Sequence, residues 1–303
     1  MRGALSILHV LLALALSPLL LGIINRTKAA FGGRRGPPLL QPYYDLAKLF
    51  GKGATYSRTT TWLFRAGPLL SLACALSALL IVPLGGIGGL VAFPGDLVLF
   101  AYLFGLMRFV MVLAALDTGS AFEGMGASRE VQFAMLAEPA LLIGLGALAA
   151  NSRSLSLSGL YAAPLAAAPA CLPALWLLAG AFLVVLLAEN ARIPVDDPTT
   201  HLELTMIHEV MLLDHSGVDL ALAEYAAAVK LWVLGALVVG VALPWRSVTA
   251  AGDLALGLAG LLALAVAVGI IESIMARLRL VRVPQLLVTA AVLSILAAAW
   301  VLR

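Results

Sequence analysis

Carboxylates and an arginine at the end of an apolar stretch are the residues of this sequence best suited to chemistry. Glu189, Arg192 and Asp196 follow an apolar run that begins near Ala170. A carboxylate at the edge of a membrane span is costly to desolvate, so it is usually paired or takes part in moving protons or ions. Glu189 and Arg192, three residues apart, would share one helix face. The alternative is an ordinary helix-end ion pair, which contributes about 0–1 kcal/mol.

A further carboxylate, Glu138, lies inside an apolar segment in the sequence Met135-Leu136-Ala137-Glu138-Pro139. An ionisable side chain within a span is a candidate for proton or ion handling. Glu138 could instead be a structural partner of Arg108 or Arg129, which would only tune its proton affinity. Arg108 also lies within an apolar segment, where it could pair or extend to the membrane surface.

The segment after Arg192 combines acids with histidines. These are Asp196, Asp197, His201, Glu203, His208, Glu209, Asp214, His215, Asp219 and Glu224. Asp197 and Pro198 predict a helix start, with Asp as the cap and Pro in the first turn. The three histidines are seven residues apart and would form one stripe if that helix ran far enough. Since seven residues span about 10 Å, too far for two ligands of one ion, we predict no metal site and favour a protein-facing stripe or a proton relay.

The elements that position these residues must lie in a membrane. The chain has 303 residues, of which 62% are hydrophobic and 12% charged, against about 45–50% and 25% in soluble domains. Apolar segments rich in Leu, Ala and Val favour an all-α protein over a β-barrel, which needs short alternating strands. The two cysteines, Cys74 and Cys171, are too few for an iron–sulfur cluster, which typically needs four thiolates.

Runs of about twenty apolar residues predict membrane-spanning helices. We expect eight, at about 3–24, 66–83, 97–116, 131–150, 170–189, 226–243, 254–273 and 285–302. The first is read as a span because a basic segment follows it where a signal peptide would have a cleavage site of small residues. The sequence therefore predicts one integral membrane domain over 1–303, with two larger polar segments at 25–65 and 190–225.

The distribution of basic residues predicts the orientation. If segment 25–65 is cytoplasmic, cytoplasmic segments hold 14 Lys and Arg residues and external segments hold four. Such a bias is typical of the cytoplasmic side. We therefore expect both termini outside.

Segment 25–65 begins as an irregular loop rich in Gly and Pro. Residues 42–50 then predict a short amphipathic helix, of the kind that lies in a membrane interface. Its basic residues could bind lipid head groups, but the glycine and proline turns favour docking of a soluble partner.

Three stretches together resemble the family of respiratory complex I subunit 1 and formate hydrogenlyase subunit 4. They are the loop from Arg34 to Phe50, the run from Ala188 to Asp197, and the run from His208 to Gly217. The resemblance covers nearly the whole chain and implies a membrane subunit that carries a hydrophilic redox arm. It points to the energy-converting [NiFe] hydrogenase branch, because residues 194–204 depart from the acidic pattern of quinone-reducing complex I.

The resemblance also implies roles for individual residues. Glu138, Glu189, Arg192, Glu203 and Glu224 match positions of the family's glutamate-rich path for ions. Asp196 and Glu209 fit the same neighbourhood. The residues that would contact the redox arm are Arg34, Arg35, Gly36, Pro37, Gln41, Pro42, Asp45 and Lys48.

The family implies partners that hold the redox centres. We expect hydrogenase-like large and small subunits, a ferredoxin-like iron–sulfur subunit and antiporter-like membrane subunits, with no cofactor on this chain and no nucleic acid. Iron–sulfur clusters and a nickel–iron centre would lie on the partners. The alternatives are a quinone-binding subunit of a proton-pumping oxidoreductase, a purely structural anchor, and a self-sufficient transporter. Missing inverted repeats argue against the last.

Overall fold

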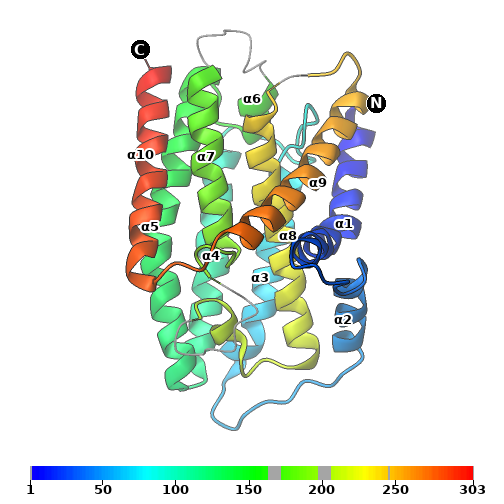
Figure 1. The fold of residues 1–303 in the computed structure, drawn as a ribbon, viewed down its shortest axis with the longest axis vertical. Helices are drawn as coiled ribbons and strands as arrows, with labels where there is room; N and C mark the ends of the chain where they lie inside the picture. The colour runs from blue at the N-terminus through cyan, green and yellow to red at the C-terminus, as the bar shows by residue number, and fades with distance from the viewer. Residues whose placement is uncertain (1, 163–171, 197–205, 245, 303) are drawn as a thin grey trace.

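The computed structural model describes residues 2–162, 172–196, 206–244 and 246–302, and the regular secondary structure of this part is helical apart from one isolated bridge. The helices run mostly along one axis (Figure 1). They are α1 Arg2–Phe31, α2 Gln41–Phe50, α3 Trp62–Ile81, α4 Asp96–Asp117, α5 Ala121–Ser152, α6 Leu157–Ala162, α7 Leu172–Glu189, η2 Glu209–Leu212, α8 Gly217–Ala242, α9 Ala250–Ile274, η3 Leu280–Arg282 and α10 Val283–Val301.

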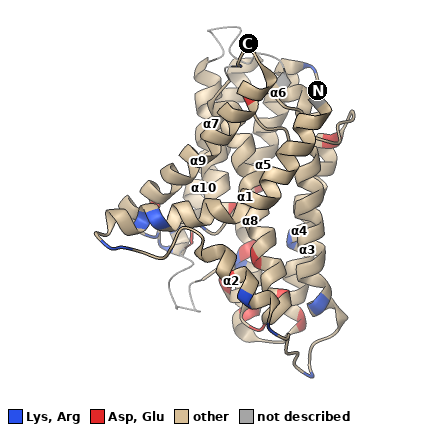
Figure 2. Cartoon of the chain, turned by 90° about the vertical axis from the view of Figure 1, so that its right-hand side faces the viewer, with Lys and Arg blue, Asp and Glu red and all other residues tan. Residues whose placement is uncertain are grey.

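Eight helices in the described part are long and apolar enough to cross a membrane, which confirms the predicted count. They are α1, α3, α4, α5, α7, α8, α9, and α10 together with η3. Both termini lie at the same end of the bundle, as an even number of spans requires (Figure 1). We call this the terminal end and the opposite one the charged end, because most charged residues lie toward it (Figure 2).

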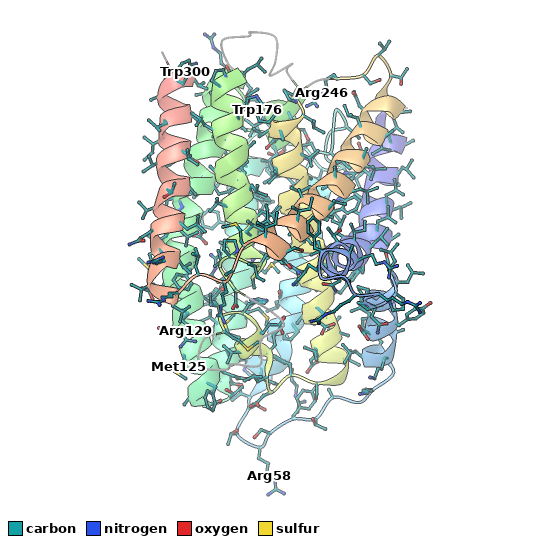
Figure 3. All side chains as sticks on the ribbon, viewed as in Figure 1. Arg58, Met125, Arg129, Trp176, Arg246 and Trp300 are labelled. Atoms are coloured by element: carbon teal, nitrogen blue, oxygen red, sulfur yellow. The ribbon has the colours of Figure 1, made fainter. Side chains whose placement is uncertain are left out.

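Three spans extend beyond the predicted bounds by seven residues or more. α1 continues to Phe31, α5 begins at Ala121 and α8 begins at Gly217. All three extensions lie toward the charged end, where polar residues can continue a helix outside the bilayer. Near the terminal end, the exposed indoles of Trp176 and Trp300 suit a membrane–water interface (Figure 3).

α8 is the central helix: 83% of its most apolar window is buried, against 28% for α4 and for α10. A helix that is apolar all round belongs in the interior of a bundle. α8 packs against α1, α3, α7 and α9. Polar residues on α8 are therefore placed to reach several helices at once.

α1 bends at Pro18, so that its second part is seen nearly end on in Figure 1. Proline has no N–H, which leaves the carbonyl of Leu14 without its helical partner. The hydroxyl of Tyr225 on α8 donates to that carbonyl at 2.8 Å. Tyr43 on α2, inside the predicted amphipathic helix, donates to the next carbonyl, that of Ala15. The two tyrosines thus satisfy backbone groups that the bend exposes.

α7 ends at Glu189, so the expectation that Glu189 and Arg192 share one helix face is wrong. The N–H of Arg192 donates to the carbonyl of Leu187 at 2.8 Å, and that of Ala191 to Ala188 at 3.2 Å. With Ala191 at a φ of 49°, this is the Schellman arrangement that closes a helix. The chain therefore turns before Arg192, whose side chain leaves in another direction.

Segment 206–216 lies against the charged end of α5. Arg129 donates to the carbonyl of Met206 at 2.9 Å, and the N–H of Asp214 donates to Glu123 at 3.0 Å. The expected histidine stripe is wrong for His208 and His215, because η2 ends at Leu212 and α8 begins only at Gly217.

Candidate ion-transfer site

Arg108 on α4 joins three carboxylates from two other helices. Its guanidinium contacts Glu130 at 3.3 Å, Glu138, and Glu189 at 2.5 Å. The side chain of Arg108 is 10% exposed, so these contacts lie largely out of solvent. A planar guanidinium with five N–H groups is suited to bind several carboxylates at once. Arg108 is thus the partner that the sequence offered for Glu138, while Arg129 binds a backbone carbonyl.

Lys230 on the central helix α8 completes this cluster. Its ammonium lies 2.7 Å from the second oxygen of Glu189, whose side chain is 5% exposed. Glu189 therefore bridges two cations. A buried charge without a partner is very costly, so each member of such a set constrains the others. We call Arg108, Glu130, Glu138, Glu189 and Lys230 the central cluster.

A cavity of about 40 Å³ adjoins the central cluster. Since a cavity of about 10–15 Å³ can hold one water, this one has room for more than one. Besides four members of the cluster, its lining includes Ser71, Asn190 and His208. These side chains can hydrogen-bond to water. The cavity therefore allows water to contact the cluster from the side of segment 206–216.

Glu138 is the most exposed member of the central cluster, with 42% of its side chain accessible. It lies in an open groove of about 300 Å³ between α4 and α5, whose lining includes Gly105, Phe109 and Met135. The central cluster thus extends from the interior of the bundle to its lateral surface.

A second group of charges ties three elements together. Glu272, near the end of α9, contacts Lys28 of α1 at 2.8 Å and Arg192 at 3.5 Å. The side chain of Glu272 is fully buried. Arg192 therefore pairs with Glu272 and not in the helix-end pair with Glu189 that the sequence allowed.

Asp196 is buried and fixed in place by several donors. Arg277 reaches it at 2.8 Å, and the N–H groups of Ile207 and His208 donate to it at 2.9 and 3.4 Å. Asp196 thus joins the end of the α7 connection to segment 206–216 and to the α9–α10 connection. This arrangement suits a structural anchor for the loop beside the cavity.

Glu224 lines a surface cleft, and Glu209 is close enough to interact with it electrostatically. Burial raises the pKa of Glu209, with Asp196 adding to the rise and His208 and Arg192 opposing it. Glu224 interacts electrostatically with Glu209 and Asp45. The cleft has a volume of about 230 Å³ and is lined by residues of α1, α2 and α8 together with Arg192. A buried carboxyl with a perturbed pKa is a candidate functional group.

The predicted docking residues fall into two groups. Residues 31–40, which include Arg34, Arg35, Gly36 and Pro37, are all exposed. Gln41, Pro42, Asp45 and Lys48 lie on α2, where the amide of Gln41 donates to Asp45 at 2.9 Å. Pro42 and Asp45 also line the cleft that contains Glu224. The exposed loop and the cleft are therefore adjacent.

Five ionisable residues of these ion pairs were not predicted as site residues from the sequence: Glu130, Lys230, Glu272, Lys28 and Arg277. The expected spans 226–243 and 254–273 contain Lys230 and Glu272, so the rule that singled out Glu138 would have found both. Glu130 stood just before an expected span. Among the predicted residues, Glu203, His201 and Asp197 lie outside the described residues. The described part holds no group of three or more His, Cys, Asp or Glu that could bind a metal.

Comparisons with known proteins show which proteins this chain resembles. A family model described as NADH dehydrogenase matches residues 4–302. Formate hydrogenlyase subunit 4 of Escherichia coli (strain K12) is 32% identical, with 92% of each chain covered. Hydrogenase-4 component C of the same strain is 34% identical, over 77% of this chain and 72% of the relative.

Two further matches are more distant. A subunit of the NADH-quinone oxidoreductase of Anaplasma phagocytophilum (strain HZ) is 30% identical over 62% of this chain and 59% of the relative. A chain in the structure of the membrane-bound sulfane sulfur reductase, an archaeal respiratory membrane complex, matches with a TM-score of 0.80. It is 22% identical and covers 98% of this chain and 100% of its own, which indicates the same fold.

Proposed function

This chain belongs to the NADH dehydrogenase family, and on that premise we propose that it is the membrane subunit of a complex I-like energy-converting hydrogenase. It would dock a hydrophilic redox arm and couple electron transfer to movement of protons or other ions. The two hydrogenase-type relatives, one of them aligned over 92% of both chains, support this assignment. Iron–sulfur clusters and the nickel–iron centre would lie on partner subunits.

The observation that carries the proposal is the composition of the central cluster. Two cations, Arg108 and Lys230, face three carboxylates, Glu130, Glu138 and Glu189. With all five ionised, one negative charge is in excess, and binding of one proton makes the cluster neutral. Because excess charge is costly within a membrane, the cluster favours uptake of a proton or a cation. This is the property that a relay needs.

The residues suggest a route through the chain. It would begin in the cleft with Asp45 and Glu224, continue past Glu209 and His208 to the cavity, and reach the central cluster. Glu138 would pass the proton on at the lateral groove, where an antiporter-like subunit would bind. The family resemblance adds Glu203 to this route. Asp196 and Arg192 would hold the loop in position beside it.

The redox arm would bind at the charged end. Arg34, Arg35, Gly36 and Pro37 would contact it directly, while α2 would relay its movements to the cleft. With the basic segments on the cytoplasmic side, both termini would face outward from the inner membrane of a prokaryote.

The test is coupling in the purified, reconstituted complex. Glu138→Gln should leave hydrogen evolution from reduced viologen within about twofold of the parent and lower ion uptake into liposomes at least tenfold. Met135→Leu, one turn earlier on the same exposed face, is the control. If Glu138→Gln translocates ions normally, the chain is a structural anchor.

Isolation of the complex in mild detergent tests the hydrogenase assignment itself. We expect nickel and cluster-bearing subunits to copurify with the chain. Partners with clusters but without nickel would contradict the proposal, and a chain that purifies alone would contradict any redox complex.

Quinone binding is the alternative that a specific observation favours. The 230 Å³ cleft between α1, α2 and α8 has an apolar side formed by Pro18, Leu21 and Leu46, and one relative is a subunit of a quinone oxidoreductase. Protection of Tyr43 or Tyr44 from a photoreactive quinone by excess quinone would support this alternative.

A further inference from the structure

α1 carries a buried polar stripe that the proposed route does not use. Ser6, His9 and Ser17 are all buried, with 7%, 0% and 0% of each residue exposed. Their spacing of three and eight residues places them on one face of the helix. Polar side chains buried within a span are costly unless they have partners or a use. The stripe therefore calls for an explanation.

His9 is the ionisable member of this stripe. The indole N–H of Trp232 on α8 donates to its Nε2 at 3.4 Å, and the two rings are stacked 6.5 Å apart. Because Nε2 accepts, the neutral imidazole carries its proton on Nδ1. This Nδ1 finds no hydrogen-bond partner among the described residues. A buried donor of this kind indicates a position for water or for proton transfer.

The two end members of the stripe lie near opposite ends of the bundle. Toward the terminal end, Ser6 donates to the carbonyl of Gly88, in the connection between α3 and α4, at 2.9 Å. Toward the charged end, Ser17 precedes Pro18, which lines the cleft together with Glu224. The hydroxyl of Tyr225, the neighbour of Glu224, lies on the carbonyl of Leu14. Buried polar groups thus occur at three positions along α1, between the cleft and the terminal end, and His9 among them contacts α8.

We propose that Ser17, His9 and Ser6 form a proton path between the cleft and the terminal end of this chain. The path would let this subunit move protons across the membrane as well as relay charge sideways through Glu138. It rests on the proposed function, since the cleft must receive protons from the redox reaction. Ser17 and His9 are about 12 Å apart along the helix, so water must complete the path. Between them on this face lies the side chain of Ala13, which is small and fully buried.

The transfer step at His9 is a simple exchange. A proton arriving at Nε2 displaces the long hydrogen bond from Trp232 and gives the imidazolium. Loss of the proton from Nδ1 to a water molecule on the path would leave a neutral ring. Rotation of the ring then restores the original tautomer. No electron or other group is transferred in this step.

The experiment compares variants of the whole complex in liposomes. His9→Gln, which cannot become a cation, should keep hydrogen evolution within about twofold of the parent and lower the number of protons moved per electron by at least one third. Ala13→Leu, which places a larger apolar side chain between Ser17 and His9, should do the same. Ala15→Leu, whose side chain is exposed on α1, is the matched control and should leave the ratio unchanged.

Two outcomes would overturn the inference. A parental ratio in either His9→Gln or Ala13→Leu would exclude a path through this stripe. If a variant does not assemble, Trp232→Phe serves instead, because it removes the hydrogen bond to Nε2 of His9 and keeps His9 itself. An unchanged pH dependence of proton translocation in Trp232→Phe would then exclude His9 as a carrier. Failure of the proposed function is distinct, since Glu138→Gln would then leave the ratio unaltered as well.

Discussion

Glu189 bridges Arg108 and Lys230 through different oxygens, at 2.5 and 2.7 Å. Removal of one charged group therefore leaves the remaining buried charges without a partner, which lowers the stability of the fold. Buried ion pairs contribute little net stability, but breaking one by removing a single partner costs about 3–5 kcal/mol. At the residue scale, the stability contributed by each charge of the central cluster therefore depends on the presence of the others.

This coupling predicts a double-mutant cycle. Glu189→Gln and Lys230→Met should each lower the stability of the complex by about 3–5 kcal/mol, because each leaves a buried charge uncompensated. The double variant should be more stable than either single one. Thermal unfolding in detergent would measure the three values, and additive losses would show that the two residues act independently.

His215 is another buried ionisable group, outside the membrane-spanning helices. Its ring stacks on Phe64 with the centroids 3.9 Å apart, and the residue is 4% exposed. Burial lowers its pKa to about 4, although Asp219 and Asp214 favour the charged form. Segment 206–216 is thus held to α3 by a neutral histidine.

The lowered pKa of His215 predicts loss of stability in acid. The unfolded chain binds the proton more readily, with a pKa near 6.5, so the stabilisation is complete above pH 6.5 and is lost as the pH falls toward 4. The full loss is about 3 kcal/mol. His215→Phe, which keeps the stacked ring, should reduce this sensitivity in thermal unfolding at pH 7 and pH 5. Equal losses in parent and variant would contradict the assignment.

At the scale of elements, the bend in α1 links three helices. Pro18 frees the carbonyl of Leu14, and Tyr225 and Tyr43 supply hydroxyls from α8 and α2. An unsatisfied carbonyl costs more in a bilayer than in water, so the tyrosines select this bent form. The bend brings α1, α2 and α8 together around the cleft. A movement of α2 would therefore change the surroundings of Glu224.

Removal of one hydroxyl tests this link. Tyr225→Phe should lower thermal stability by about 1–2 kcal/mol, since it leaves the Leu14 carbonyl without a donor. Tyr102→Phe is the matched control, because Tyr102 is 74% exposed on α4 and should tolerate the change. Equal effects of the two substitutions would show that the hydroxyl of Tyr225 does not support the bend.

Across the whole molecule, charged residues are concentrated toward the charged end (Figure 2). The central cluster, the Glu272 group and the cleft all lie toward the charged end or in the middle. The exposed loop 31–40 contains two adjacent arginines. A soluble partner with acidic patches would be attracted to this end.

Charge reversal tests the docking surface. The double variant Arg34→Glu with Arg35→Glu should reduce copurification of hydrophilic subunits at least fivefold, and more strongly at low salt than at high salt, because salt screens interactions between exposed charges. Arg153→Glu, beyond the end of α5 at the terminal end, is the control. Quantitative mass spectrometry of the purified complex measures both. Parental recovery with Arg34 and Arg35 reversed would assign docking to other residues.

The sequence by itself determined the eight spans and the short helix at residues 42–50, and it singled out Glu138 and Glu189 as candidate site residues. These features follow from local patterns: length and hydropathy define a span, and an acid within a span is conspicuous. The same rule extends to Lys230 and Glu272, which also lie within expected spans. Local patterns could not show that Tyr225 and Tyr43 donate hydrogen bonds near the bend at Pro18, because both tyrosines lie in distant segments of the chain.

Only the tertiary structure decided which charges meet. Arg192 stands three residues after Glu189, yet the Schellman turn at Ala191 sends it to Glu272, 80 residues further along the chain. Arg108 similarly selects carboxylates from α5 and α7. Pairing depends on helix packing and on where each helix ends, and both are set by contacts between residues far apart in sequence. Spacing along the chain therefore identified the ionisable groups, and the fold assigned their partners.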